Sequence, residues 1–136
     1  MASTLKINTL TGVTTAGSIA VTGEGNSTTT NLQQGLCKSW VNLDSTGTAS
    51  TRDSFNVSSI TDNSTGKTTI TVTNAFANAN FAYSVASGYT DGGQGVHPEV
   101  HEDVITTSSY GIGSINTSNS AADSANVFSL VAGDLA

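Results

Sequence analysis

The stretch of sequence that decides the fold is Asp62-Asn63-Ser64-Thr65-Gly66-Lys67-Thr68-Thr69-Ile70-Thr71-Val72-Thr73. Ile70 and Val72 alternate with threonines, a pattern typical of a strand that has one buried face. The Asp, Asn and Gly residues before them favour the backbone angles of a chain reversal. The stretch therefore predicts a β-hairpin whose second strand points its two aliphatic side chains into a core.

Similar runs lie on both sides of this hairpin. Residues 36–43 carry apolar side chains on both faces of a predicted strand, and residues 55–60 form the next apolar run. Further along, residues 81–86 alternate in the same way, and residues 110–115 and 126–131 complete the series. No segment keeps a helical period, so the sequence predicts an all-β fold, a single β-sandwich or jelly-roll-like domain.

The large apolar side chains of these runs are expected to anchor the core. They are Trp40, Phe55, Ile70, Val72, Phe81 and Tyr83. Cys37 lies in the first of the runs and is the only cysteine, which excludes an internal disulfide and favours a small buried side chain.

Residues 1–34 differ from the rest because they contain no aromatic residue, and their two β-like runs lie among Thr, Gly and Asn. Their apolar residues are Leu5, Ile7, Leu10, Val13, Ile19 and Val21. So few apolar groups cannot build a core alone and need another surface to cover them. We therefore predict an extended N-terminal arm, residues 1–34, followed by a β-sandwich domain, residues 35–136.

Composition excludes several classes of function. Only 10% of the 136 residues are charged, and the net charge is −6. The fixed cations are Lys6, Lys38, Arg52 and Lys67. So few cations argue against binding to nucleic acid or to an anionic membrane. The sequence also predicts no membrane span and no signal peptide.

One cluster could carry chemistry, His97-Pro98-Glu99-Val100-His101. In an extended chain His97, Glu99 and His101 share one face, and imidazole and carboxylate groups are ligands for divalent transition metals. Against this reading, Pro98 disrupts strand pairing, and the glycines of residues 91–95 indicate an exposed loop. We therefore expect neither a metal nor another cofactor here.

The sequence also lacks a catalytic constellation. No serine lies in a nucleophile-elbow pattern, and Cys37 is expected in the core. Glu102 and Asp103 are adjacent, so in a strand their carboxylates point to opposite faces. Gly111 and Gly113 flank a single isoleucine without the strand-to-helix context of a phosphate loop, which favours a bulge or close packing. We expect no catalytic residues and no enzymatic activity.

With the strands placed, the chain resembles a family of phage proteins. Residues 3–10 resemble the start of small virion proteins of marine tailed phages of the cyanophage and pelagiphage type. Residues 35–42, 52–63 and 79–83 are similar to a module of phage tail-fibre and virion-surface proteins. The resemblance implies a β-rich, non-catalytic virion component that is often trimeric. Tail fibres with this module are usually longer, which favours a capsid decoration or head-fibre subunit.

The sequence thus leads to two hypotheses. In the first, the chain is a virion-surface structural protein, a homotrimer attached by its arm to the major capsid protein or to tail proteins. In the second, it is a short tail-fibre or receptor-binding subunit that contacts a host glycan or surface protein. The candidate surface-binding loop for that contact comprises Tyr89, His97, Glu99 and His101, with Tyr110 as a second aromatic candidate.

Overall fold

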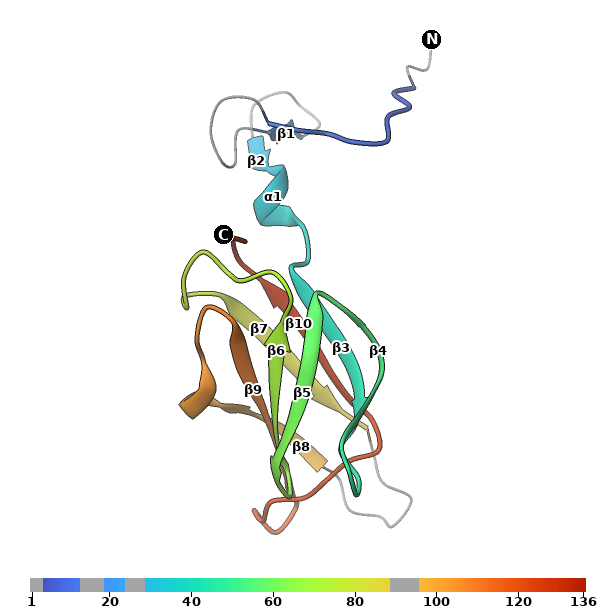
Figure 1. Ribbon diagram of the computed structural model, residues 1–136, viewed down its shortest axis with the longest axis vertical. Helices are drawn as coiled ribbons and strands as arrows, with labels where there is room; N and C mark the ends of the chain where they lie inside the picture. The colour runs from blue at the N-terminus through green and yellow to red at the C-terminus, as the bar shows by residue number, and fades with distance from the viewer. Residues whose placement is uncertain (1–3, 13–18, 24–28, 89–95) are drawn as a thin grey trace. The chain divides into compact units, whose positions relative to one another are not determined.

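The computed structural model describes residues 4–12, 19–23, 29–88 and 96–136. The chain divides into two compact units, Met1–Leu36 and Cys37–Ala136, close to the boundary predicted between the arm and the domain. Each unit is described by itself (Figure 1).

The N-terminal unit contains one short hairpin and one helical turn. Strand β1 (Ala20–Thr22) pairs antiparallel with β2 (Thr29–Asn31). The single turn α1 (Leu32–Gly35) follows, and the Asn31 side chain caps it by accepting a hydrogen bond from the Gln34 backbone N–H at 3.2 Å. Residues 4–12, which include the first predicted β-like run, belong to no helix or strand. An isolated strand is not stable without a partner, which accounts for the missing element.

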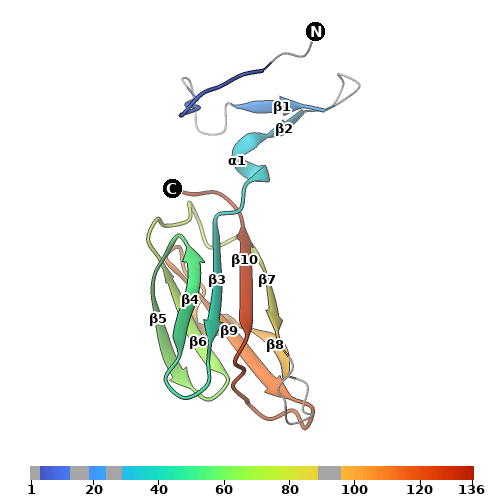
Figure 2. The same ribbon diagram turned by 90° about the vertical axis from the view of Figure 1, so that its right-hand side faces the viewer.

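The unit Cys37–Ala136 is a sandwich of two four-stranded antiparallel sheets, which confirms the predicted all-β fold (Figures 1 and 2). Sheet I has the order β4-β3-β10-β7 and consists of β3 (Ser39–Asp44), β4 (Ser50–Phe55), β7 (Ala82–Ser87) and β10 (Val127–Ala132). Sheet II has the order β5-β6-β9-β8 and consists of β5 (Val57–Ser64), β6 (Lys67–Val72), β8 (Val96–His101) and β9 (Ser109–Asn116). A short 3₁₀ turn, η1 (Glu102–Val104), links β8 to β9.

The core lies between the two sheets and is built from alternate residues of their central strands. Its fully buried side chains include Val41, Leu43, Ile70, Val72, Phe76, Tyr110, Ile112, Val127 and Val131. Tyr110 is buried at the centre of this cluster, and its hydroxyl forms a hydrogen bond with the Ser129 hydroxyl at 2.9 Å. Because the phenol has a partner, the polar atom can be buried at little cost.

The predicted core anchors divide into two groups. Ile70 and Val72 are buried, and Phe81 and Tyr83 pack against the core from its rim. The structure corrects the assignment of Trp40 and Phe55, which both lie outside the core. Strand β3 carries apolar residues on both faces, and Val41 and Leu43 take the inner one, so Trp40 must face outward.

The predicted turn at residues 62–66 closes the β5–β6 hairpin. Gly66 has a φ of 69°, and a Cβ atom at this position would lie 2.4 Å from the Ser114 carbonyl oxygen. Its N–H donates to the Asp123 carboxylate at 2.6 Å. Only glycine fits this conformation and this close approach, so the turn also fixes the loop after β9.

Asn56 marks the point where the chain passes from sheet I to sheet II. It separates β4 from β5 and has a φ of 57°, which asparagine tolerates better than most residues. Its side-chain amide donates to the carbonyl oxygens of Lys38 and Asn74 at 2.9 and 3.1 Å. Its side-chain oxygen accepts from the Asn74 N–H at 2.7 Å. The crossing is therefore held by one side chain.

Candidate functional site

The outer face of sheet I carries a cluster of large apolar side chains. We call this cluster the outer patch and define it as Trp40, Phe55, Phe128 and Leu130. Phe55 is 51% exposed, Phe128 40% and Leu130 54%, whereas Trp40 is partly buried. Single exposed apolar residues are ordinary, but a contiguous group of this kind is a candidate interaction surface.

Strand pairing makes the outer patch contiguous. Trp40 lies directly opposite Phe55 on β4 and opposite Leu130 on β10. Phe128 lies two residues from Leu130 along β10, opposite Asn42 on β3 and Ala86 on β7. Side chains at opposite positions of neighbouring strands have Cβ atoms about 5 Å apart. The patch therefore crosses three neighbouring strands without a break.

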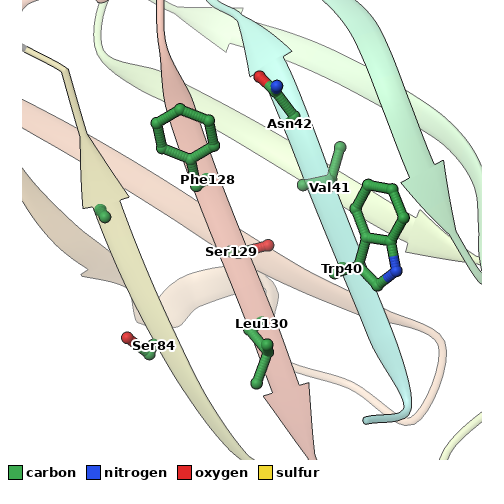
Figure 3. Close-up of a pocket in the computed structure, with 8 residues that line it drawn as sticks. Trp40, Val41, Asn42, Ser84, Phe128, Ser129 and Leu130 are labelled. Atoms are coloured by element: carbon green, nitrogen blue, oxygen red, sulfur yellow. The ribbon is translucent and has the colours of Figure 1, made fainter.

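Between these side chains the sheet surface forms a shallow, open hollow (Figure 3). Trp40 and Asn42 line it from β3, Phe128 and Leu130 from β10, and Ser84 from β7. The side-chain oxygen of Asn42 is buried and has no hydrogen-bond partner among the described residues. A buried acceptor left without a donor costs about 1–3 kcal/mol, so a bound partner that supplied one would be favoured here.

The charged groups beside the outer patch are mainly acidic. Asp53 lies opposite Asn42 on β4 and is exposed. Asp44 forms an ion pair with Arg52, with 2.9 Å between Oδ2 and Nη2. The pKa of Asp44 is lowered, chiefly because its carboxylate accepts hydrogen bonds from the Thr46 hydroxyl and backbone N–H, and less because of Arg52. This rim favours a partner without negative charge.

Four of the five residues of the predicted assembly arm that the structure describes are exposed. Leu5 is 79% exposed, Leu10 54%, and Ile7 and Val21 50% each. Ile19 is partly buried, and Val13 lies outside the described residues. The N-terminal unit thus presents apolar side chains to solvent, as the outer patch does on the sandwich.

Three residues of the predicted surface-binding loop lie on strand β8. Tyr89 lies outside the described residues, and His97 and Glu99 are exposed on β8. His101 is partly buried, with its Nε2 3.6 Å from Asp103 Oδ2. Within the described residues, no three His, Cys, Asp or Glu side chains are grouped so that they could hold a metal ion.

Two further expectations concern Tyr110 and Gly111 on β9. Tyr110 is fully buried, which overturns its reading as an exposed aromatic for glycan contact. Gly111 packs closely, because a Cβ atom there would lie 2.5 Å from the His101 carbonyl oxygen. The glycines of β9 thus let β8 and η1 approach the strand, which is the close packing expected from the sequence.

Sequence reasoning missed the contribution of β10 to the outer patch. Val127, Phe128, Ser129, Leu130 and Val131 form an almost continuous apolar run, which does not show which residues face inward. The signal was present, because a strand with apolar residues on both faces needs cover on both. No helix among the described residues has the length and apolar character needed to cross a membrane.

Comparison with models of protein families, with curated proteins and with solved structures gives no match to this chain. The resemblance to phage virion-surface proteins stays a prediction from the sequence. The candidate site therefore rests on the geometry of the outer patch and on the exposed N-terminal residues.

Proposed function

We propose that the chain is a non-enzymatic structural protein of an assembly, attached to its neighbours by the N-terminal unit. The observation that carries the proposal is the contrast between the two units. The sandwich closes a core of its own, whereas Leu5, Ile7, Leu10 and Val21 remain exposed. A segment whose apolar side chains are exposed to solvent is explained most simply as one that a partner covers.

The energetics of such attachment are favourable. Each aliphatic side chain that moves from water into a pocket contributes about 1.5–3 kcal/mol before ordering costs. An extended segment can also donate its backbone groups to an exposed sheet edge. Repetition of the contact over many copies would make the attachment effectively irreversible.

The resemblance of residues 3–10 and 35–86 supplies the finer part of the proposal. On that basis the protein is a virion-surface component of a tailed phage, a capsid decoration or head-fibre subunit. Its partners are then the major capsid protein or tail proteins, and the chain assembles as a homotrimer. This role requires no cofactor, nucleic acid or membrane.

A second candidate function is a short tail-fibre or receptor-binding subunit. The observation that favours it is the exposure of His97, Glu99 and Val100 along the edge strand β8. Copy number separates the two roles, since a decoration protein is present in hundreds of copies and a tail appendage in far fewer. Quantitative mass spectrometry of purified particles measures this number.

The test of the main proposal uses the full chain with Leu10→Asp and Val21→Asp, and measures its incorporation into particles. We expect incorporation to be lost, because burying a charge in an apolar pocket is costly. The matched control is Thr61→Asp, which adds a charge at an exposed position of β5. Equal incorporation of both proteins would overturn the proposal.

A further inference from the structure

Strand β7 is an open edge of sheet I. Within the described part of the chain its hydrogen-bonded neighbour is β10 alone, so the other side of β7 has no ladder partner. At one end the Ser87 hydroxyl donates to the Val96 carbonyl oxygen and ties the strand to β8. The segment from Ala82 to Ala86 is therefore the part of β7 that a further strand could join.

The remaining edge strands carry features that oppose such pairing. Strand β4 has a register shift opposite residues 42 and 43 and carries Arg52 and Asp53. Strand β5 has two register shifts and carries Asp62. Strand β8 contains Pro98, which has no N–H to donate. Bulges, charges and proline are the usual means of protecting an edge, and β7 has none of them.

The side chains of β7 also leave room for an added strand. Its outward residues Ala82, Ser84 and Ala86 are small and exposed. Ser84 lies opposite Leu130, and Ala86 lies opposite Phe128. Large apolar side chains on an incoming strand would therefore lie beside small residues and lean across them toward Phe128 and Leu130, which are two strand spacings, about 10 Å, away.

The size of the face indicates a slender occupant. Strands lie about 4.8 Å apart and rise about 3.4 Å per residue, so four strands of this length cover roughly 300–400 Å². One partner in a standard protein interface contributes about 800 Å². The outer face of sheet I is thus small for stacking a second sandwich on it, which favours an extended segment that joins the sheet at its edge.

Charge points to the same kind of occupant. Residues 37–136 hold all but one of the 10 acidic residues and all but one of the 4 basic ones, so the sandwich alone carries the net charge of −6. Residues 1–23 contain one charged side chain, Lys6. Two sandwiches of this charge repel each other, whereas residues 1–23 bring one positive charge to the negatively charged sandwich.

The segment that fits these requirements lies in the chain itself. Residues 4–12 belong to no helix or strand, and Leu5 and Ile7 are exposed. In an extended chain these two side chains point to the same side. Leu5 and Ile7 could therefore extend the apolar outer face of sheet I past β7 while the backbone pairs with that strand.

We propose that the N-terminal segment of one copy adds as a strand to the β7 edge of a second copy, with Leu5 and Ile7 on the outer face, beside the small residues of β7 and directed toward Phe128 and Leu130. The proposal rests on the proposed function in one respect, that the N-terminal unit is the assembly element. It names the partner as a second copy of the chain. The β1–β2 hairpin with Val21 stays available for other proteins of the assembly.

Disulfide cross-linking between copies tests this contact. Two proteins are prepared in a Cys37→Ser background, one tagged and carrying Ile7→Cys, the other untagged and carrying Ser84→Cys or Ala86→Cys. They are mixed with oxidised glutathione as the oxidant. The control partner carries Thr61→Cys, an exposed position of β5 in sheet II. Circular dichroism checks that every variant is folded.

We expect covalent dimers of tagged and untagged chains to form about tenfold or more faster with the β7 cysteines than with the control, because docking raises the effective concentration of the thiols. Equal rates for β7 and control would mean random collision and overturn the proposal. A chain carrying both Ile7→Cys and Ser84→Cys that closes only on itself would also overturn it, because the occupant would then be its own segment. Cross-linking needs no particles, so its failure is distinguishable from the outcome of the incorporation test on the protein that carries Leu10→Asp and Val21→Asp.

Discussion

The inner faces of the two sheets are similarly apolar, whereas their outer faces differ in polarity. On sheet II the outward residues of β5 and β6 include Ser59, Thr61, Lys67, Thr69 and Thr71. On sheet I the corresponding surface carries Trp40, Phe55, Phe128 and Leu130. Because both sheets contribute to one core, stability does not require the second apolar face. The difference is what our proposal requires, with sheet II facing water and sheet I facing a partner.

The largest expected effect is the difference between two leucine substitutions in sheet I, one on its inner face and one on its outer face. Leu43→Ala removes a fully buried side chain and should lower the free energy of unfolding by about 2–5 kcal/mol. Leu130→Ala removes a side chain that is 54% exposed and should cost less than about 1 kcal/mol. Urea denaturation of both proteins measures the difference. Equal losses would mean that the outer patch belongs to the core.

The next effect concerns the crossing between the sheets. Asn56→Ala removes the side-chain hydrogen bonds to Lys38 and Asn74 and places alanine at positive φ. We expect a loss of about 1–3 kcal/mol, mainly from the broken hydrogen bonds. Asn56→Gly keeps the backbone angle and should recover only part of this loss. Full recovery by glycine would show that the side-chain bonds contribute little.

A smaller effect is expected at alkaline pH. Burial, with smaller contributions from Tyr110 and Glu102, raises the pKa of Tyr83 from 10.0 to about 12. Its hydroxyl also donates to the Gly111 carbonyl oxygen at 2.9 Å, a bond that deprotonation removes. The neutral phenol therefore stabilises the fold fully below pH 10, and this contribution is lost as the pH rises toward 12.

Thermal unfolding between pH 9 and 12 measures this dependence. Tyr83→Phe should flatten the fall in melting temperature between pH 10 and 12, relative to the unmodified protein. The remaining fall includes Tyr110, whose pKa is also raised, chiefly by burial. An identical pH dependence in both proteins would contradict the assignment of Tyr83.

The smallest expected effect on stability comes from a substitution that should make the outer face of sheet I clearly less apolar. Phe128→Ser should change the free energy of unfolding by less than about 1 kcal/mol, because its side chain is already 40% exposed. It should also lower the binding of an apolar fluorescent dye to the folded protein. Thr71→Ser on sheet II is the matched control and should leave dye binding unchanged. Reduced binding in both variants would locate the apolar surface elsewhere.

The sequence predicted those parts of the fold where one face of a strand is apolar and the other polar. The hairpin around Gly66, with Ile70 and Val72 inward, is the clearest case. The prediction was wrong at Trp40 and Phe55, because size and hydrophobicity alone do not tell a core residue from a docking residue. In β3 and β10 both faces are apolar, so alternation does not assign the inner one.

The candidate site was predictable only in part. The exposure of the apolar residues in the arm was predictable, because the arm contains too few apolar groups to form a core. The outer patch could not be assembled from sequence, because it depends on the pairing of β10 with β3, two strands that lie far apart in the chain. Shared periodicity placed His97, Glu99 and His101 on one strand, β8, but within the described residues they are not grouped so that they could hold a metal ion.

The central claim is that the sandwich folds alone and that the N-terminal unit links copies. Sedimentation of the full chain and of the fragment Cys37–Ala136, with circular dichroism of both, tests it most directly. We predict that the fragment keeps its β-sheet spectrum and sediments as a monomer, whereas the full chain sediments as an oligomer. An unfolded fragment, or a fragment that oligomerises as the full chain does, would contradict the claim.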